Sequence, residues 1–271
     1  MVNCVRFLLK LLFLILIIFL LSAFLALAYF GVIPGISDLL GANKPRDLGI
    51  KYTEADRTSG RAKSQIVYEA LQENTPAAQS IQRFGKREVN AEFSSSEISS
   101  LMNNRPWKYW PYANVQVKFN ADGSAEISGI LLKDKISGYG AAIGAPQEAV
   151  DFAQKLLTAN PTFYVKGKAA LANNKVSEFE PERFEIGRVP LPVSVFLSYF
   201  PKVFSGTEAL AASPTDTISQ LSQIKNKREL IINYINGRLS QINGFYAKGA
   251  RFGENKLIFN GTLAEREATV R

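Results

Sequence analysis

The sequence predicts an α+β protein in which a long apolar helix precedes a domain of antiparallel hairpins and amphipathic helices. Leu11–Phe30 contains no charged side chain, which is typical of a membrane-spanning helix. Val115–Phe119 and Ala125–Leu132 alternate apolar and polar residues around the turn-forming Asn120–Gly123, a pattern that indicates a β-hairpin. Ile218–Ile242 instead repeats apolar residues at helical spacing. Hairpins interleaved with a few such helices favour an α+β arrangement.

The apolar segment predicts a single-pass membrane anchor, since a helix of this length reaches about 30 Å, the thickness of a hydrocarbon core. Arg6 and Lys10 precede it and the next cation is Lys44, so we expect a cytoplasmic N-terminus and an extracytoplasmic remainder. A cleaved signal peptide is the alternative, because Ala26-Leu27-Ala28 offers a small-x-small cleavage site. The apolar run continues past that site, which favours an uncleaved anchor in the cell membrane. Both interpretations export residues 35–271.

We divide the chain into three parts on this basis. Residues 1–34 contain the basic cytoplasmic end and the anchor, and residues 35–46 form a linker that overlaps the glycine- and proline-containing stretch Gly31–Pro45. Residues 47–271 form the extracytoplasmic α+β domain, which is long enough to build a sizeable core.

Composition limits the chemistry of the exported part. The chain has no histidine, which excludes a Ser-His-Asp triad and the usual zinc and copper sites. The one cysteine, Cys4, precedes the apolar segment, so the domain contains no disulfide. The whole chain has a net charge of +8, and the excess of cations in the exported part is dispersed without a run of five like charges. This excess suits an anionic membrane surface or an ordinary solvated surface rather than nucleic acid. We therefore expect no cofactor, no metal and no nucleic-acid partner.

Two capping boxes predict where helices begin in the domain. Thr53 and Ser94 each stand three residues before a carboxylate, so that hydroxyl and acid satisfy the first backbone N–H groups of a helix. The first of these helices is expected to continue to about Leu71. Pro146 suits the first turn of a third helix that runs to about Thr158.

Two further segments between the hairpins are rich in glycine or in phenylalanine. Gly138–Gly144 is expected to be a flexible turn, since its glycine pattern is one residue too long for a dinucleotide-binding loop. Val193–Phe204 has the apolar character of a helix, which Pro201 should kink or end.

Five more segments alternate with a period of two and predict strands of half-buried sheet. The segments are Lys86–Phe93, Thr162–Leu171, Val176–Val189, Phe245–Phe252 and Leu257–Leu263. Asn173-Asn174 joins two of them and tolerates the positive φ of a tight turn. Pro190 and Pro192 should stop strand pairing, because proline lacks the N–H donor. The last hairpin is expected to close the domain.

Residues 107–112 concentrate four aromatic side chains and one lysine beside Pro106 and Pro111. The aromatic residues are Trp107, Tyr109, Trp110 and Tyr112. Amphipathic rings of this kind suit a membrane interface, a sugar-stacking platform or the mouth of a lipid pocket. The alternative is that they divide between the core and its rim. We treat them as a candidate membrane or surface aromatic patch.

Glu178, Glu180 and Glu182 alternate along one predicted strand. Spaced carboxylates can serve acid–base chemistry or calcium binding. No calcium-binding loop accompanies them, and a solvated outer face opposite Phe179 and Phe184 is the favoured interpretation. We assign no catalytic residue.

Several stretches in a fixed order resemble a known family. They are Val89–Ile98, the Val115–Gly129 hairpin, Phe163–Gly167 and Phe184–Pro192, the last of which ends in Val-Pro-Leu-Pro. This order, over roughly residues 86–204, resembles bacterial membrane-anchored envelope proteins of the LmeA and YpmS kind, related to the tubular lipid-binding (TULIP) superfamily. The resemblance implies a long, strongly curved antiparallel sheet wrapped around a helix, with an apolar groove for acyl chains.

The candidates for lining such a groove come from the second long hairpin and the phenylalanine-rich helix. They are Phe163, Val165, Phe184, Ile186, Phe196 and Phe200. The resemblance supplies no catalytic residues, so we expect a non-enzymatic domain that binds lipid or another apolar ligand at the membrane surface. Two alternatives stay open: a structural or protein-interaction module of the cell envelope with a filled core, and a carboxylate-dependent hydrolase.

Overall fold

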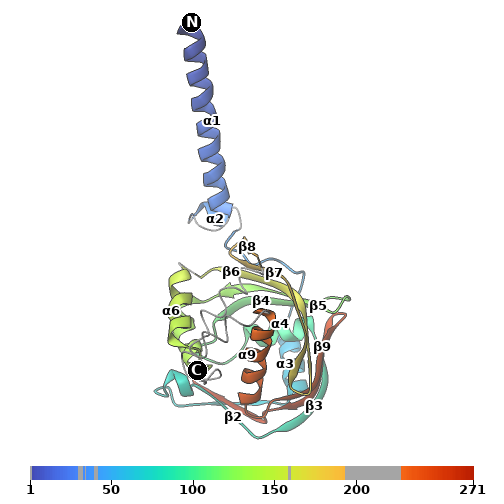
Figure 1. The fold of residues 1–271 in the computed structure, drawn as a ribbon. Helices are drawn as coiled ribbons and strands as arrows, with labels where there is room; N and C mark the ends of the chain where they lie inside the picture. The colour runs from blue at the N-terminus through green and yellow to red at the C-terminus, as the bar shows by residue number, and fades with distance from the viewer. Residues whose placement is uncertain (1, 30–32, 34, 40–41, 158–159, 193–226) are drawn as a thin grey trace.

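The computed structural model describes residues 2–29, 33, 35–39, 42–157, 160–192 and 227–271. Helix α1 (Val2–Tyr29) projects away from the rest of the molecule, and the short helix α2 (Ile36–Leu39) lies at its base (Figure 1). The side chains of α1 are described from Phe13 on, and the large apolar ones among them are exposed. Within the described residues, no helix combines the length and the apolar character that crossing a membrane requires.

The domain is built on an eight-stranded, largely antiparallel sheet that curls into a half barrel (Figure 1). Its strands are β3 (Arg87–Ser94), β4 (Tyr112–Phe119), β5 (Ser124–Leu131), β6 (Thr162–Ala172), β7 (Lys175–Ile186), β8 (Val189–Leu191), β9 (Tyr246–Gly253) and β10 (Lys256–Leu263). Strand β6 is the branch point, because β7 pairs along one of its edges while β5 and then β9 share the other. The sheet therefore has two arms, β5–β4 and β9–β10–β3.

Helix α4 (Ser95–Asn103) packs between these two arms. Ile98 contacts the core cluster of the first arm, which contains Val115 and Phe119, and the cluster of the second, which contains Phe93 and Phe259. Helix α3 (Glu54–Ser64) packs against α4. The expected α+β arrangement and the curved antiparallel sheet are thus confirmed, with the core enclosed by the curl.

The polar face of α4 covers the outer edge of β4. The backbone N–H groups of Phe119, Val117 and Val115 donate to Ser95 Oγ, Ser99 Oγ and Asn103 Oδ1 over 3.1, 2.8 and 2.8 Å. Residues four apart lie on one face of a helix, so three side chains match every second residue of the strand. The helix in this way satisfies backbone groups of an edge strand that would otherwise be buried without partners.

The described part of the domain contains three other helices: α5 (Ile136–Ala142), α6 (Gln147–Leu156) and α9 (Lys227–Gln241). Helix α9 lies against β7, where Val176 N–H donates to Asn236 Oδ1 over 2.7 Å. It coincides with the later part of the helix predicted over Ile218–Ile242, whose beginning lies outside the described residues. The helix predicted over Val193–Phe204 lies outside them as well.

Local signals in the sequence located most strand and helix starts correctly. Thr53 and Ser94 both form complete capping boxes at the starts of α3 and α4. Asn173 and Asn174 adopt φ of 52° and 60° in the turn between β6 and β7. The three predicted hairpins and the isolated strand over Lys86–Phe93 are all present.

Three expectations about local structure were wrong. The helix from Thr53 ends at Ser64, because Gln65 turns left-handed at φ 55°, and strand β1 (Val67–Ala70) replaces its last turns. Gly138–Gly144 is mostly the helix α5 instead of a turn. Pro190 does not stop pairing, since β8 pairs with the outer edge of β7, where its missing N–H leaves no gap in a central ladder.

A second, three-stranded sheet was not predicted. Strand β11 (Arg266–Thr269) lies between β1, to which it is parallel, and β2 (Ile81–Phe84), to which it is antiparallel. The hairpin of β9 and β10 therefore does not close the domain. The chain instead returns to pair with strands that lie near its start.

Candidate functional site

Strands β6 and β7 place four of the predicted lining residues side by side. Phe163 lies opposite Ile186 and Val165 opposite Phe184, so alternation puts all four on one face of the sheet. All four side chains are half-buried. Phe196 and Phe200 lie outside the described residues.

Neighbouring strands extend this apolar row in both directions across the sheet. In β5, Ile127 lies opposite Val165, and in β8, Leu191 lies opposite Phe184. Along β6 and β7 the same face continues through Ala169, opposite Phe179. Ile127 and Leu191 were missed by the sequence analysis, because only the strand register shows that they join the row. We call the face that carries Phe163, Val165, Phe184 and Ile186 the inner face.

The aromatic residues predicted as a surface patch lie largely inside the molecule. Trp107 is 6% exposed and its Nε1 donates to Ser80 Oγ over 3.1 Å. Trp110 is half-buried and its Nε1 donates to the carbonyl oxygen of Met102 over 2.7 Å. Tyr109 and Tyr112 are half-buried too. Both indole N–H groups are thus satisfied within the domain, as buried tryptophans require.

These rings connect to the inner face. Tyr112 makes an edge contact with Phe163 at 5.7 Å between ring centroids, and with Tyr139 of α5 at 6.1 Å. Burial, reinforced by the neighbouring Tyr139, raises the pKa of the Tyr112 phenol far above its ordinary value, so it stays neutral. The aromatic cluster therefore packs beside Phe163 and extends the apolar surface of the inner face.

The opposite face of the same strands is polar. Gln116, Ser128, Tyr164 and Glu185 follow one another in register across β4, β5, β6 and β7. The Tyr164 hydroxyl donates to Glu126 Oε2 over 2.7 Å, and burial together with this carboxylate raises the pKa of Tyr164 to about 12. The sheet thus separates a polar outer face from an apolar inner face.

The residues that follow α2 run along this polar outer face and are fixed to it. Arg46 Nε and Nη2 donate to the two carboxylate oxygens of Glu185 over 2.9 and 2.8 Å. Leu48 and Ile50 N–H both donate to Gln116 Oε1, over 2.8 and 3.3 Å. Glu185 is 1% exposed and the Arg46 side chain is 40% exposed, so the bidentate pair is buried on its carboxylate side. We call Arg46–Ile50 the strap; no sequence signal had indicated it.

The candidate carboxylates do not converge on a site. Glu178, Glu180 and Glu182 are exposed, and Glu182 pairs with Lys166 at 3.0 Å. Glu185 is neutralised by Arg183 as well as by Arg46. In the part of the chain that the structure describes, no group of three or more Asp, Glu, Cys or His side chains could hold a metal ion.

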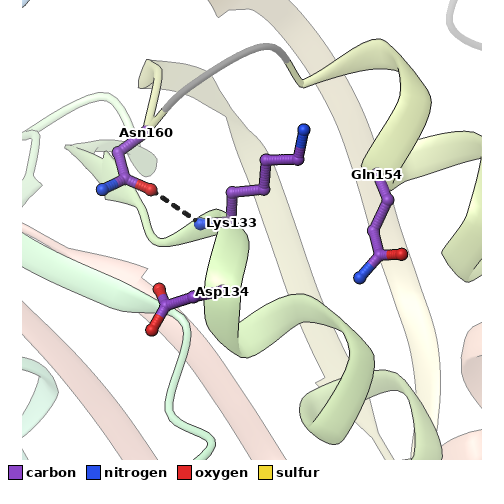
Figure 2. Close-up of a pocket in the computed structure, with 4 residues that line it drawn as sticks. All are labelled: Lys133, Asp134, Gln154 and Asn160. Atoms are coloured by element: carbon purple, nitrogen blue, oxygen red, sulfur yellow. Dashed lines mark hydrogen bonds between the residues drawn. The ribbon is translucent and has the colours of Figure 1, made fainter.

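A separate pocket of about 500 Å³ opens beside the 3₁₀ helix η2 (Lys133–Lys135), and Figure 2 shows four side chains that line it. They are Lys133, Asp134, Gln154 and Asn160. Lys133 N–H donates to Asn160 Oδ1 over 2.9 Å, which ties the start of η2 to the residues before β6. These lining residues are polar and do not suit an acyl chain. Comparisons of the chain with models of protein families, with curated proteins and with solved structures find no match.

Proposed function

We propose that this protein is a membrane-anchored, extracytoplasmic, non-enzymatic domain that binds lipid or another apolar ligand on the inner face of its curved sheet. The observation that carries the proposal is the apolar row of Phe163, Val165, Phe184 and Ile186, whose side chains share one face and are only half-buried. Covering such surface with an acyl chain contributes about 25 cal/mol per Å² of apolar area removed from water.

The anchor is supported by the sequence and by the position of α1. Leu11–Phe30 carries no charge and follows Arg6 and Lys10. Before its last turn, helix α1 projects away from the domain, and apolar side chains such as Phe13 and Phe19 are 64% and 66% exposed. Exposed apolar surface of this extent on a soluble helix is unfavourable, and a bilayer would cover it. The domain that follows would lie on the extracytoplasmic side.

A binding role suits the chemistry of the inner face better than catalysis. The acids of β7 that could have formed a catalytic pair either face solvent, as Glu180 does, or are neutralised by arginine, as Glu185 is. General acid–base catalysis by carboxylates needs at least one such group to exchange protons with a bound substrate. The hydrolase hypothesis therefore has no carboxylate pair to rest on among the described residues of β7.

The direct test is the binding of a fluorescent fatty acid to the detergent-solubilised full chain. We expect Phe184→Ala to weaken binding at least about tenfold, because truncating a large aromatic contact removes roughly 1.4 kcal/mol or more of apolar contact. Phe84→Ala is the matched control, since Phe84 is 38% exposed in the three-stranded sheet, away from the inner face. The Phe84→Ala variant should bind the fatty acid with the same affinity as the unaltered chain.

The rival is an envelope interaction module whose interior is filled by its own side chains. The packing of α9 against β7 is the observation that favours it. Lipid extraction and mass spectrometry of the purified full chain separate the two hypotheses. Absence of a co-purifying lipid, together with no measurable fatty-acid binding, would reject the lipid-binding proposal in favour of the filled module.

A further inference from the structure

The point at which α1 meets the domain is a packed junction instead of a free tether. Arg188, in the turn between β7 and β8, lies over the ring of Tyr29 at 5.7 Å from its centroid. Ala28 is fully buried. The hydroxyl of Thr162 lies 3.2 Å from the carbonyl oxygen of Gly187 and 3.5 Å from that of Ala42. The last turn of α1, Ala42 and the β7–β8 turn therefore lie at the same end of the domain.

The strap also holds this end of the domain in place, through its contacts with the polar outer face of the sheet. Its Arg46–Glu185 pair is bidentate and buried on the carboxylate side, and Gln116 accepts two further backbone N–H groups. Glu185 directly precedes Ile186 and the β7–β8 turn. The strap and the junction thus fix the β7–β8 turn on the same side of the domain as α2.

Helix α2 presents one apolar side chain outward at this end. Ser37 is fully buried; its Oγ accepts the N–H of Ile33 over 3.2 Å, and its carbonyl oxygen accepts the N–H of Ala42 over 2.8 Å. Leu39, two residues later, is 88% exposed, the highest value among the large hydrophobic side chains of the described residues. A leucine held outward by a folded turn, next to the exposed apolar surface of α1, is a site that a bilayer would cover.

We propose that the domain itself is seated on the bilayer by this end, with Leu39 inserted at the interface and Tyr29 and Arg188 at the level of the headgroups. The partner is the lipid surface, since the exposed leucine belongs to α2, which lies at the base of the apolar helix α1 (Figure 1). Tyrosine favours the interface through its amphipathic ring, and arginine keeps its guanidinium among the phosphates while its stem packs below. The inference rests on the proposed anchoring by α1, and it adds a second contact and a fixed orientation.

This orientation has a consequence for the inner face. Phe163 and Ile186 are the members of the apolar row closest in sequence to the junction residues Thr162 and Gly187, and Gly187 N–H donates to the carbonyl oxygen of Thr162 over 2.7 Å. The apolar row would therefore start at the membrane. An acyl chain could pass from the bilayer onto the inner face without crossing the polar outer face.

The test measures membrane depth in the full chain reconstituted into phosphatidylcholine vesicles that contain doxyl-labelled lipid. Single cysteines for an environment-sensitive fluorophore are introduced in a Cys4→Ser background as Phe19→Cys, Leu39→Cys and Val67→Cys. Phe19 reports on the anchor, and Val67, 53% exposed in β1, is the matched apolar control on the domain. We expect lipid quenching at positions 19 and 39 and none at position 67.

The outcomes separate the two proposals. Quenching at position 19 without quenching at position 39 would overturn the seated domain and leave the anchor intact. No quenching at any position would reject the anchor, and with it the seating that rests on it. Equal quenching at positions 39 and 67 would show adsorption without a defined orientation, which also overturns the inference.

Discussion

Glu267 of β11 is a buried carboxylate shared by two arginines. It is 3% exposed, and it accepts hydrogen bonds from Arg105 over 2.6 and 2.7 Å and from Arg83 over 3.0 Å. We predict that Glu267→Gln destabilises the domain by about 3 kcal/mol, because both guanidinium groups lose their counter-ion in a poorly solvated site. The measurement is urea denaturation of the detergent-solubilised chain.

The control for this prediction lies in the same small sheet. Glu69 pairs with Arg266 at 3.3 Å, but both side chains are well exposed, at 41% and 54%. An exposed ion pair contributes about 0–1 kcal/mol, so Glu69→Gln should leave the denaturation midpoint almost unchanged. If Glu267→Gln and Glu69→Gln lower the free energy of unfolding equally, burial does not strengthen the Glu267 site and the prediction is wrong.

Glu97 makes the stability of the domain depend on pH in the acid range. Burial opposes its ionisation, but hydrogen bonds from Lys63, Ser59 and the Ser94 N–H outweigh that effect and hold the pKa of Glu97 below the ordinary 4.5. A carboxyl whose pKa is lowered by folding contributes stability above its unfolded pKa and loses it as the pH falls through the folded value. We therefore predict that stability declines as the pH falls from about 5 toward 3.

Thermal unfolding as a function of pH tests this prediction. Glu97→Gln removes the titrating group, so the melting temperature should be lower at pH 7 and should fall less steeply in acid. Glu88→Gln is the control, because Glu88 of β3 is exposed. If the melting temperature of Glu97→Gln falls with decreasing pH as steeply as that of the unaltered chain, other carboxylates cause the pH dependence.

Single residues also show where sequence reasoning succeeds and where it stops. The capping boxes at Thr53 and Ser94 are local devices of four residues, and both were predicted correctly. The end of the first helix was not, because Gln65 adopts the left-handed conformation without the glycine or asparagine that usually marks it. Gly138 and Gly140 serve close packing instead of a turn, since a Cβ at either position would overlap Tyr109 or Val150.

At the scale of elements, side chains of α4 accept the backbone N–H groups along the edge of β4 that a neighbouring strand would otherwise bind. We predict that Ser99→Ala costs about 1–3 kcal/mol, because the N–H of the 3%-exposed Val117 loses its acceptor and stays buried. Hydrogen exchange should show faster exchange of the Val117 amide and of its neighbours in β4. Ser96→Ala, on another face of the same helix, is the matched control, and it should leave exchange in β4 unchanged.

Long-range pairing explains the main element that was missed. Strands β1, β2 and β11 have four residues each, too few for an alternating pattern to stand out. Val67 of β1 pairs with Arg266 of β11, a partner from the far end of the chain. The hairpins were predictable because a short turn joins their strands, whereas nothing local links β1 with β11. For the same reason, the sequence analysis did not include Ile127 and Leu191 among the lining residues, since only strand pairing places them on the inner face.

At the scale of the whole molecule, contacts of the strap and of residues just before it tie the segment after α1 to the domain. Residues 35–46 were expected to be a tether, yet Ser37 and Ala42 are buried and Arg46 is paired with Glu185. Among the described residues of this segment, Ser37, Ala42 and Arg46 are therefore buried or paired. A membrane protein built in this way would present one end of its sheet to the bilayer, while a freely tethered domain would sample all orientations.

This difference can be measured as a distance distribution. We predict that spin labels at Phe19→Cys and Val67→Cys, in a Cys4→Ser background, give one narrow distribution by pulsed electron resonance in nanodiscs. Adding Arg46→Ala and Gln116→Ala removes the bidentate pair and both backbone acceptor contacts of the strap, so the distribution should broaden. Lys51→Ala, at an exposed position just beyond the strap, should not change it. A broad distribution in the unaltered chain would mean that the strap does not orient the domain, and that the junction at Tyr29 and Arg188 opens freely.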